Sequence, residues 1–213
     1  MKYVYFLLCS LFLAACTQVA ENVSLPDSNE HFNEKEYKNA FEHSTALQLF
    51  FKEDQTTAGF LGEGNEYASF TEETIWLTDT IVQTVVDNGG VTMYRIYRIA
   101  DQAIDLVYED VTSPNLTVDE IEKLPTIELY MALPIERNTS FDGWVITAID
   151  VTVKTPFQTF TQAIEVVKET DDFKTSRYFV RGFGLVKQID EMKMADGVFV
   201  VSSTLKEIQY HSN

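Results

Sequence analysis

Cys16 is the residue whose chemistry the sequence indicates most directly. It follows an apolar run at residues 3–13 and the small pair Ala14-Ala15, and Lys2 places a positive charge at the start. A run of this kind is typical of a secretory signal peptide and is too short to span a bilayer as a helix of the mature protein. A cysteine at the expected cleavage point adds a nucleophile, because its thiolate can form a thioether.

The four residues Leu13-Ala14-Ala15-Cys16 resemble the bacterial lipobox. The resemblance implies transfer of a diacylglyceryl group to the sulfur of Cys16 and cleavage before it, so that residues 1–15 form the signal peptide. Two acyl chains, at roughly 0.8 kcal/mol per buried methylene, hold a protein stably on a membrane. We therefore expect the membrane as a partner through this lipid, at the extracytoplasmic face of the cell membrane. An ordinary signal peptide is the alternative.

The segment Gly62-Glu63-Gly64-Asn65-Glu66 is the most conspicuous polar cluster. Its carboxylate and amide oxygens could suit a hard cation such as calcium, and Glu63 with Glu66 could act as paired carboxylates of an enzyme. A true calcium loop places more oxygen ligands at alternate positions, so a solvated glycine-rich turn is the favoured interpretation. Gly182 and Gly184 similarly favour a bend in a sheet over a phosphate loop, because a strand rather than a helix is expected to follow them.

Histidine offers little for catalysis. The chain has His31, His43 and His211, two near the expected spacer and one near the end. A Ser-His-Asp arrangement needs an oriented imidazole, and zinc needs clustered histidine and cysteine. Cys9 leaves with the signal peptide and Cys16 carries lipid, so no disulfide is expected. We predict no enzyme, no catalytic residue, no metal site and no cofactor.

The charge of the chain limits its partners. Its formal charge is −17, and the loss of Lys2 with the signal peptide makes the mature chain one unit more negative. Phosphates require a basic surface, which excludes nucleic acid as a partner. The same acidity argues against the protein body lying flat on anionic lipid, and it is typical of an exported domain kept soluble by charge.

The mature chain divides into a spacer and one domain. Residues 16–38 are polar and lack a sustained period, and some twenty flexible residues give a reach of roughly 25 Å. Residues 34–47 could form a short helix capped by Asn33. Residues 39–213 are expected to form a single antiparallel β domain, since a chain with 45% hydrophobic and 13% aromatic residues can bury one core.

The pattern predicts roughly eleven strands joined by short turns. The apolar run at residues 47–51 opens the first strand, and residues 66–78 form a long one. Asp87-Asn88-Gly89-Gly90 between two β-rich runs predicts a hairpin. In residues 91–99 the odd positions are apolar except for Arg95. The pattern therefore only partly determines the register of this strand, that is, which of its side chains face the core.

Residues 109–125 break the strand pattern with two prolines and an acidic cluster, and they predict a loop with room for one helical turn. This loop is the candidate boundary between two halves. Short connections leave little room for crossover helices, which excludes a parallel sheet. The predicted fold class is mainly all-β: an antiparallel meander, curled as a half-barrel or packed as a sandwich, with at most one short N-terminal helix.

Aromatic residues are abundant for one sheet. Ordinary core packing explains most of them. If the sheet curls and leaves an open concave face, Tyr67, Phe70, Trp76 and Trp144 are the candidates for contact with an apolar ligand.

Four segments together resemble an uncharacterised family of lipoproteins from Gram-positive bacteria. They are GEGNEYASF at residues 62–70, NGG at 88–90, TPFQTF at 155–160 and GFGLVK at 182–187. The resemblance covers most of the mature domain and implies an antiparallel β domain on a lipid anchor. The family carries no established activity, so no catalytic residue is transferred. The chain departs from the family pattern at Phe157-Gln158, where a small residue is expected before Thr159, and at Arg181, where a small residue or proline is expected.

The leading functional prediction is a membrane-anchored, extracytoplasmic, non-enzymatic binding module, with a protein, a wall component or a small ligand as its partner. The alternative is a carrier or chaperone that holds an apolar ligand on the concave face of a curled sheet. A continuous cavity lined by the four candidate aromatic residues favours the carrier, and a filled core favours the binding module.

Overall fold

The computed structural model describes residues 47–211. These residues are almost entirely antiparallel strand, with one 3-10 turn and one short helix, which confirms the predicted fold class. The predicted signal peptide, the lipidation of Cys16, the spacer at 16–38 and all but the last residue of the predicted helix at 34–47 lie outside the described residues.

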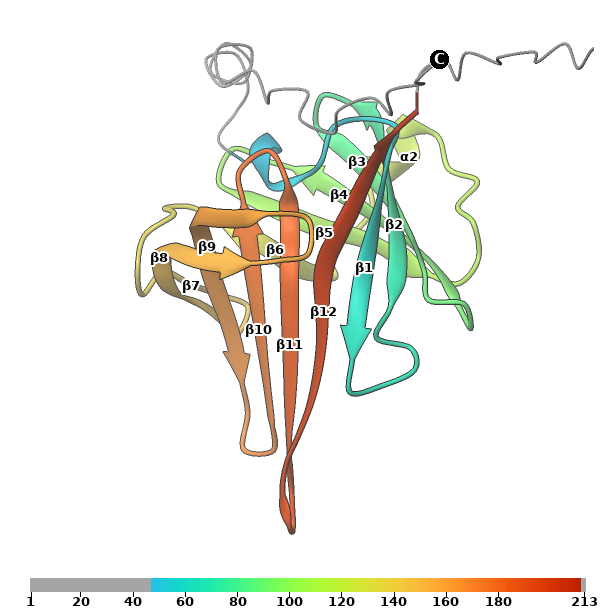
Figure 1. The fold of residues 1–213 in the computed structure, drawn as a ribbon. Helices are drawn as coiled ribbons and strands as arrows, with labels where there is room; N and C mark the ends of the chain where they lie inside the picture. Colours follow the sequence, from blue (N-terminus) through green and yellow to red (C-terminus); the bar gives the residue numbers. More distant parts are fainter. Residues whose placement is uncertain (1–46, 212–213) are drawn as a thin grey trace, which may run out of the picture.

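Twelve strands form a single sheet. In chain order they are β1 (Thr56–Glu63), β2 (Phe70–Thr78), β3 (Ile81–Asp87), β4 (Thr92–Ile99), β5 (Ala103–Asp110), β6 (Glu128–Ala132), β7 (Ser140–Phe141), β8 (Trp144–Lys154), β9 (Thr159–Glu169), β10 (Phe173–Val180), β11 (Gly184–Met194) and β12 (Gly197–Tyr210). Their spatial order is β6-β5-β4-β3-β2-β1-β12-β11-β10-β9-β8-β7. Two six-stranded meanders therefore meet where β1 pairs with β12 (Figure 1).

The sheet curls until its end strands, β6 and β7, lie close together, and side chains bridge the gap. The amide of Leu129 donates to Asp142 Oδ2 at 3.0 Å. The carboxylate of Glu128 accepts from Trp144 Nε1 and from Lys168 Nζ, each at 2.8 Å. The curl thus hides both free edges of the sheet, which would otherwise offer unpaired backbone groups to other strands.

The first apolar run is not a strand, so that prediction is wrong. Residues 48–50 form the 3-10 turn η1 (Gln48–Phe50), which lies inside the curl of the sheet. Successive side chains of a strand point to opposite faces, whereas here Phe50 and Phe51 are both buried, 0% and 6% exposed. The turn therefore delivers two aromatic rings to the same core.

The main core lies on the concave face. Its buried members are Leu47, Phe50, Phe51, Val82, Tyr97, Ile99, Ile104, Leu106, Met131, Phe141, Trp144, Ile146, Ile164, Val166, Phe179 and Leu185. A second cluster centres on Phe60, Phe160 and Leu205, where β8 and β9 extend across the sheet. Side chains therefore pack against both faces of the sheet along much of its width.

The loop at residues 109–125 covers the outer face of the first meander. It contains the predicted helical turn, α2 (Val118–Ile121), which Thr117 and Glu120 close with a capping box. Ile121 packs on Ile96 and its neighbours from outside the sheet. The loop lies within the first meander, however, and the two meanders divide later, between β6 and β7.

Gly184 provides a test of how tightly η1 is packed. Its φ is +61°, and a Cβ built there would lie 2.9 Å from the carbonyl oxygen of Phe50. We expect Gly184→Ala to lower the free energy of unfolding by about 1–3 kcal/mol more than backbone strain alone, because the η1 backbone must shift. Chemical denaturation measures the difference.

Gly89→Ala is the matched control, because Gly89 has φ +80° and nothing within 4 Å of its built Cβ. It carries the strain of a left-handed backbone, about 1–2 kcal/mol, without the contact. Equal destabilisation by the two substitutions would contradict tight packing of η1 against β11.

Candidate functional site

The four candidate aromatic residues do not line one continuous cavity. Trp144 is buried in the main core at 4% exposure, and Trp76 packs against that core. Tyr67 and Phe70 instead border a groove lower on the concave face. Trp76 and Trp144 thus belong to the main core, whereas Tyr67 and Phe70 belong to the groove.

Aromatic rings occupy the upper part of the concave face. Phe51 lies 5.1 Å from Tyr97, 5.7 Å from Tyr130 and 6.0 Å from Trp76, measured between ring centroids. Phe50 meets Phe179 edge-on at 6.2 Å. These rings fill the space beneath η1 where an apolar ligand of a carrier would have to lie.

Below the rings lies a recess that we call the polar groove. It comprises a cavity of about 300 Å³ and an adjoining one of about 70 Å³, which share Glu72, Arg95, Arg177, Leu185 and Gln188. Its walls come from strands β2 to β6 on one side and from β10, β11 and β12 on the other. The pairing of β1 with β12 sets these walls opposite each other.

Arg177 is held in the groove by two contacts. Its guanidinium carbon lies 4.3 Å from the centre of the Trp144 ring, and its Nε donates to Gln188 Oε1 at 3.3 Å. Gln188 Nε2 in turn donates to Asp190 Oδ2 at 2.8 Å, and Thr175 Oγ1 donates to Asp190 Oδ1 at 2.7 Å. This chain of hydrogen bonds orients Gln188 and restrains Arg177.

The other charged groups of the groove form pairs. Arg95 Nε donates to Glu109 Oε1 at 2.7 Å, and buried Lys52 donates to Glu72 Oε1 at 2.7 Å. Burial acts to lower the pKa of Arg95, but the nearby Tyr97 and Glu109 outweigh it and raise that pKa. The guanidinium is therefore charged at any physiological pH.

Tyr130 adds a neutral phenol at the 70 Å³ end of the groove. Burial, reinforced by Tyr97 and Glu72, raises the pKa of Tyr130 well above its ordinary value. Its hydroxyl therefore keeps its proton and remains available as a hydrogen-bond donor.

Both arginines interrupt an alternating strand pattern in the sequence. Arg95 interrupts the inward-facing series Met93-Arg95-Tyr97, which is the exception already seen in residues 91–99. Arg177 stands two residues before the buried Phe179, so strand alternation puts both on the concave face. A cation at an inward-facing position on each of two strands therefore indicates this groove, whereas the two tryptophans among the predicted aromatic residues belong to the core.

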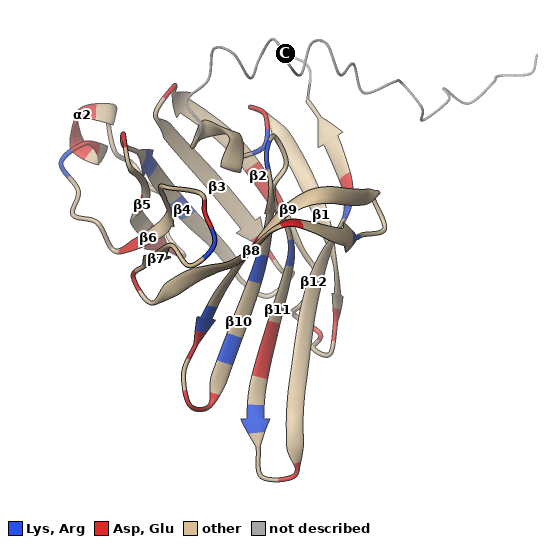
Figure 2. Cartoon of the chain, turned by 90° about the vertical axis from the view of Figure 1, so that its left-hand side faces the viewer, with Lys and Arg blue, Asp and Glu red and all other residues tan. Residues whose placement is uncertain are grey.

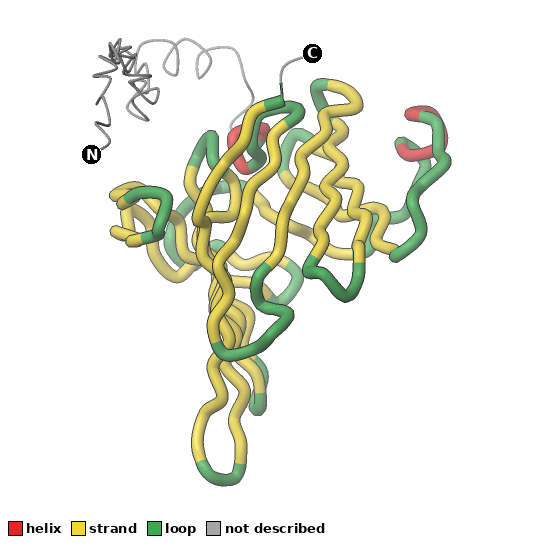
Figure 3. The backbone as a smooth tube through the Cα atoms, turned by 45° about the vertical axis from the view of Figure 1, so that its right-hand side comes forward, coloured by secondary structure: helices red, strands yellow, loops and turns green. Residues whose placement is uncertain are grey.

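A second feature is the apolar end of the β11–β12 hairpin, which projects beyond the rest of the sheet (Figures 1 and 3). We call it the hairpin tip, with the neighbouring turn of β9–β10 included. Its exposed apolar side chains are Phe173, Met194, Val198, Phe199 and Val200, which are between 44% and 56% exposed. Cross-strand register aligns Phe173, Met192 and Phe199 in one row on the concave side.

Acidic residues surround the hairpin tip. Asp171, Asp172, Glu191 and Asp196 flank it, while Lys193 and Lys174 are the nearby cations, and Lys174 pairs with Glu191 at 3.4 Å. Figure 2 shows the lower half of β12 free of charge, with an acidic turn at its end. The tip is thus an apolar surface with a mainly acidic rim.

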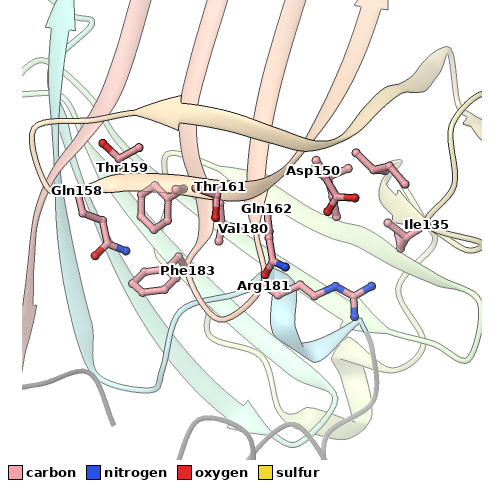
Figure 4. A pocket seen from close by; sticks show the side chains of 12 residues that line it. Ile135, Asp150, Gln158, Thr159, Thr161, Gln162, Val180, Arg181 and Phe183 are labelled. Atoms are coloured by element: carbon pink, nitrogen blue, oxygen red, sulfur yellow. The ribbon is translucent and has the colours of Figure 1, made fainter. Parts of the chain in front are cut away.

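A further cavity, of about 510 Å³, lies beneath the arm formed by β8 and β9 (Figure 4). Phe160 and Phe183 form one end, with ring centroids 5.0 Å apart. Its polar lining residues Gln158, Thr159, Thr161 and Gln162 are exposed to solvent. It is an open recess on the surface, and it contains none of the predicted site residues.

The segment with Glu63 and Glu66 forms an exposed turn between β1 and β2. Gly64 has φ +87°, and Asn65 Oδ1 accepts from the amide of Tyr67 at 2.7 Å. Within residues 47–211 no hydrogen bond or ion pair joins the two glutamates. The same range contains no group of three or more His, Cys, Asp or Glu placed to hold a metal ion.

None of the helices in the described range has the length and apolar character that a membrane crossing would need.

No family model matches the sequence, and no curated protein matches it either. Two solved structures are similar over 76% of this chain and 98% of their own. One, from Bacteroides fragilis, is described as an exported protein with a YmcC-like fold (10% identity, TM-score 0.48). The other, from Parabacteroides distasonis, is described as a lipoprotein (14% identity, TM-score 0.47). Likeness at this level assigns no family or activity to the chain, and the resemblance to Gram-positive lipoproteins stays a prediction.

Glu128 yields a prediction on pH. Burial acts to raise its pKa, but hydrogen bonds from Lys168 and Trp144 outweigh burial and lower it. A lowered pKa in the folded state stabilises the fold above the ordinary value near 4.5, and this stability is lost as pH falls through the folded pKa. We expect Glu128→Gln to be less stable than the wild type at pH 7, by about 1 kcal/mol, and the difference to shrink in acid.

Thermal unfolding from about pH 7 to pH 3 measures that difference. Glu136→Gln, which alters an exposed carboxylate in the loop between β6 and β7, should leave the pH profile unchanged. A Glu128→Gln protein with the wild-type profile would show that Glu128 does not bridge the end strands.

Proposed function

We propose that this protein is an exported, lipid-anchored binding module that recognises a protein partner through the hairpin tip. The observation that carries the proposal is the row of exposed apolar side chains on a projecting hairpin. Exposed apolar patches on folded proteins mark surfaces that contact partners. Met194 and Phe199 are 53% and 44% exposed, and Phe199 lies between Val198 and Val200, which are exposed as well.

Other modes of binding have less support. Partner strands commonly add to a free sheet edge, but the end strands β6 and β7 lie against each other and are bridged by Glu128 and Asp142. An apolar ligand held on the upper part of the concave face, beneath η1, would have to displace Phe50 and Phe51, which fill that space. The hairpin tip needs no such rearrangement.

The acidic rim determines which partner fits. An anionic membrane or a second copy of this chain would bring like charges against Asp171, Asp172 and Asp196, at a formal chain charge of −17. A protein with an apolar contact surface and basic residues around it would bring opposite charges. The proposed partner is therefore a protein of that kind, reached from the membrane by the tethered domain.

Site-specific photocrosslinking in the native host tests the proposal. The full chain carries a photoreactive residue at Val198, 56% exposed on the tip, or at Val111, 60% exposed in the loop after β5. We expect a discrete protein adduct from position 198 and none from 111. The crosslinked peptide should lie in an apolar surface with a basic rim.

Phe199→Asp supplies the second readout. Substitutions at exposed positions usually change stability by less than about 0.5 kcal/mol, so the fold should survive while the adduct at position 198 is lost. Equal adducts at both positions, an adduct with lipid, or a dimer of this chain would each overturn the proposal.

A further inference from the structure

We propose that the polar groove binds a small amphiphile with an oxyanion head group, held by Arg177 and Arg95. The proposal is independent of the proposed function, because the groove and the exposed end of the hairpin tip share no lining residue.

Arg177 carries the first part of the argument. The described residues supply acceptors for only one of its nitrogen atoms, Nε, through Gln188. No described carboxylate forms an ion pair with it, and its two terminal amino groups have no hydrogen-bond acceptor in residues 47–211. Arginine cannot lose its proton at physiological pH, so the groove presents a restrained positive fork suited to a planar or tetrahedral oxyanion.

The carboxylates of the groove are already engaged. Glu109 accepts from Arg95, Glu72 from Lys52, and Glu128 from Lys168 and Trp144. Asp190 is bound by Thr175 and by Gln188, which separates it from Arg177. Of the charged groups that line the groove, Arg177 is thus the cation without a carboxylate partner. An anionic ligand would supply that partner.

The lining indicates what the rest of the ligand is. Arg95 and Arg177 line both parts of the groove, and the phenol of Tyr130 lines only the 70 Å³ end. Only the 300 Å³ part is lined by Tyr67, Phe70, Val86 and Val201. A ligand with an anionic head at the first end and a small apolar body against the second matches both. The volume is at the lower limit for small-molecule sites.

Phe70 fixes the apolar wall. Its ring stacks on Phe60 with centroids 4.4 Å apart, and Lys52 Nζ lies 5.3 Å from the Phe60 ring while it pairs with Glu72. The wall is therefore rigidly attached to the charged part of the groove. The distance between the apolar wall at Phe70 and the charged groups of the groove is therefore fixed.

Calorimetry with four matched probes tests the proposal on the full lipidated chain in phosphatidylcholine nanodiscs, with empty discs subtracted. The probes are 3-phenylpropionate, phenyl phosphate, 3-phenylpropanol and 3-phenylpropylamine. We expect the two anions to bind at least tenfold more tightly than the alcohol and the amine not to bind. The stronger of the two anions identifies a carboxylate or a phosphate head.

The quantity to compare among variants is the ratio of anion affinity to alcohol affinity, because partial unfolding alters both affinities alike. Arg177→Gln and Arg95→Gln should each lower the ratio about tenfold, and Arg177→Lys should keep most of it. Phe70→Ala should weaken anion and alcohol equally. Lys187→Gln is the control, since Lys187 is next to Gln188 in β11 but points to the opposite face.

The proposal is overturned if anion and alcohol bind the wild type equally, if no probe binds, or if the ratio survives both arginine substitutions. It is also overturned if Lys187→Gln lowers the ratio as much as Arg177→Gln does. Phe199→Asp should leave the ratio unchanged, so failure at the groove and failure at the hairpin tip are distinguishable.

Discussion

The pairing of β1 with β12 is the interaction on which the rest of the structure depends. It joins the first strand of the sheet to the last, from Thr56 against Tyr210 to Glu63 against Ser202. Without it the two meanders would be separate six-stranded sheets, each with a long free edge. With it, the curl that follows brings β6 to β7, and side chains rather than backbone bonds close that gap. Contacts so distant in sequence are slow to form, because the loop between them must close first.

The curl gives the concave face three zones along the strands. The upper zone is filled by rings, with Phe50 and Phe51 contributed by η1 from outside the ladder. The middle zone is the polar groove, where each charge is bound or restrained by a neighbour. The lower zone is the apolar row of the hairpin tip, beyond the reach of the opposite meander. The character of each zone follows from what lies opposite it: an inserted turn, a facing wall or solvent.

This zoning explains why one protein could use two surfaces independently. The groove is enclosed by both meanders, and its charges lie in a partly desolvated setting where electrostatic interactions are stronger than in water. The hairpin tip has no facing strand and presents apolar area directly to a partner. The proposed tether, attached before residue 47, would leave both accessible, since the tip points away from the region where the described chain begins (Figure 1).

Local sequence determined the strands, the turns and the fold class. Asn88-Gly89 formed the expected hairpin, the loop at 109–125 formed its helical turn, and alternation gave the faces of most strands, because these features depend on backbone preferences of neighbouring residues. The two-residue strand β7 cannot be predicted from the sequence, because so short a segment has no period. The prediction of a strand at residues 47–51 is wrong because an apolar segment can be buried by insertion into a core as well as by pairing in a sheet.

The tertiary structure alone decided which side chains meet. Trp76 and Trp144 became core while Tyr67 and Phe70 became a groove wall, a distinction that depends on η1 entering the curl. Arg95 and Arg177 are 82 positions apart in the numbering of the chain, and only the β1–β12 pairing sets their strands face to face. Sequence therefore determined the strands and the face each residue occupies, whereas the site arose from long-range pairing, which no local preference encodes.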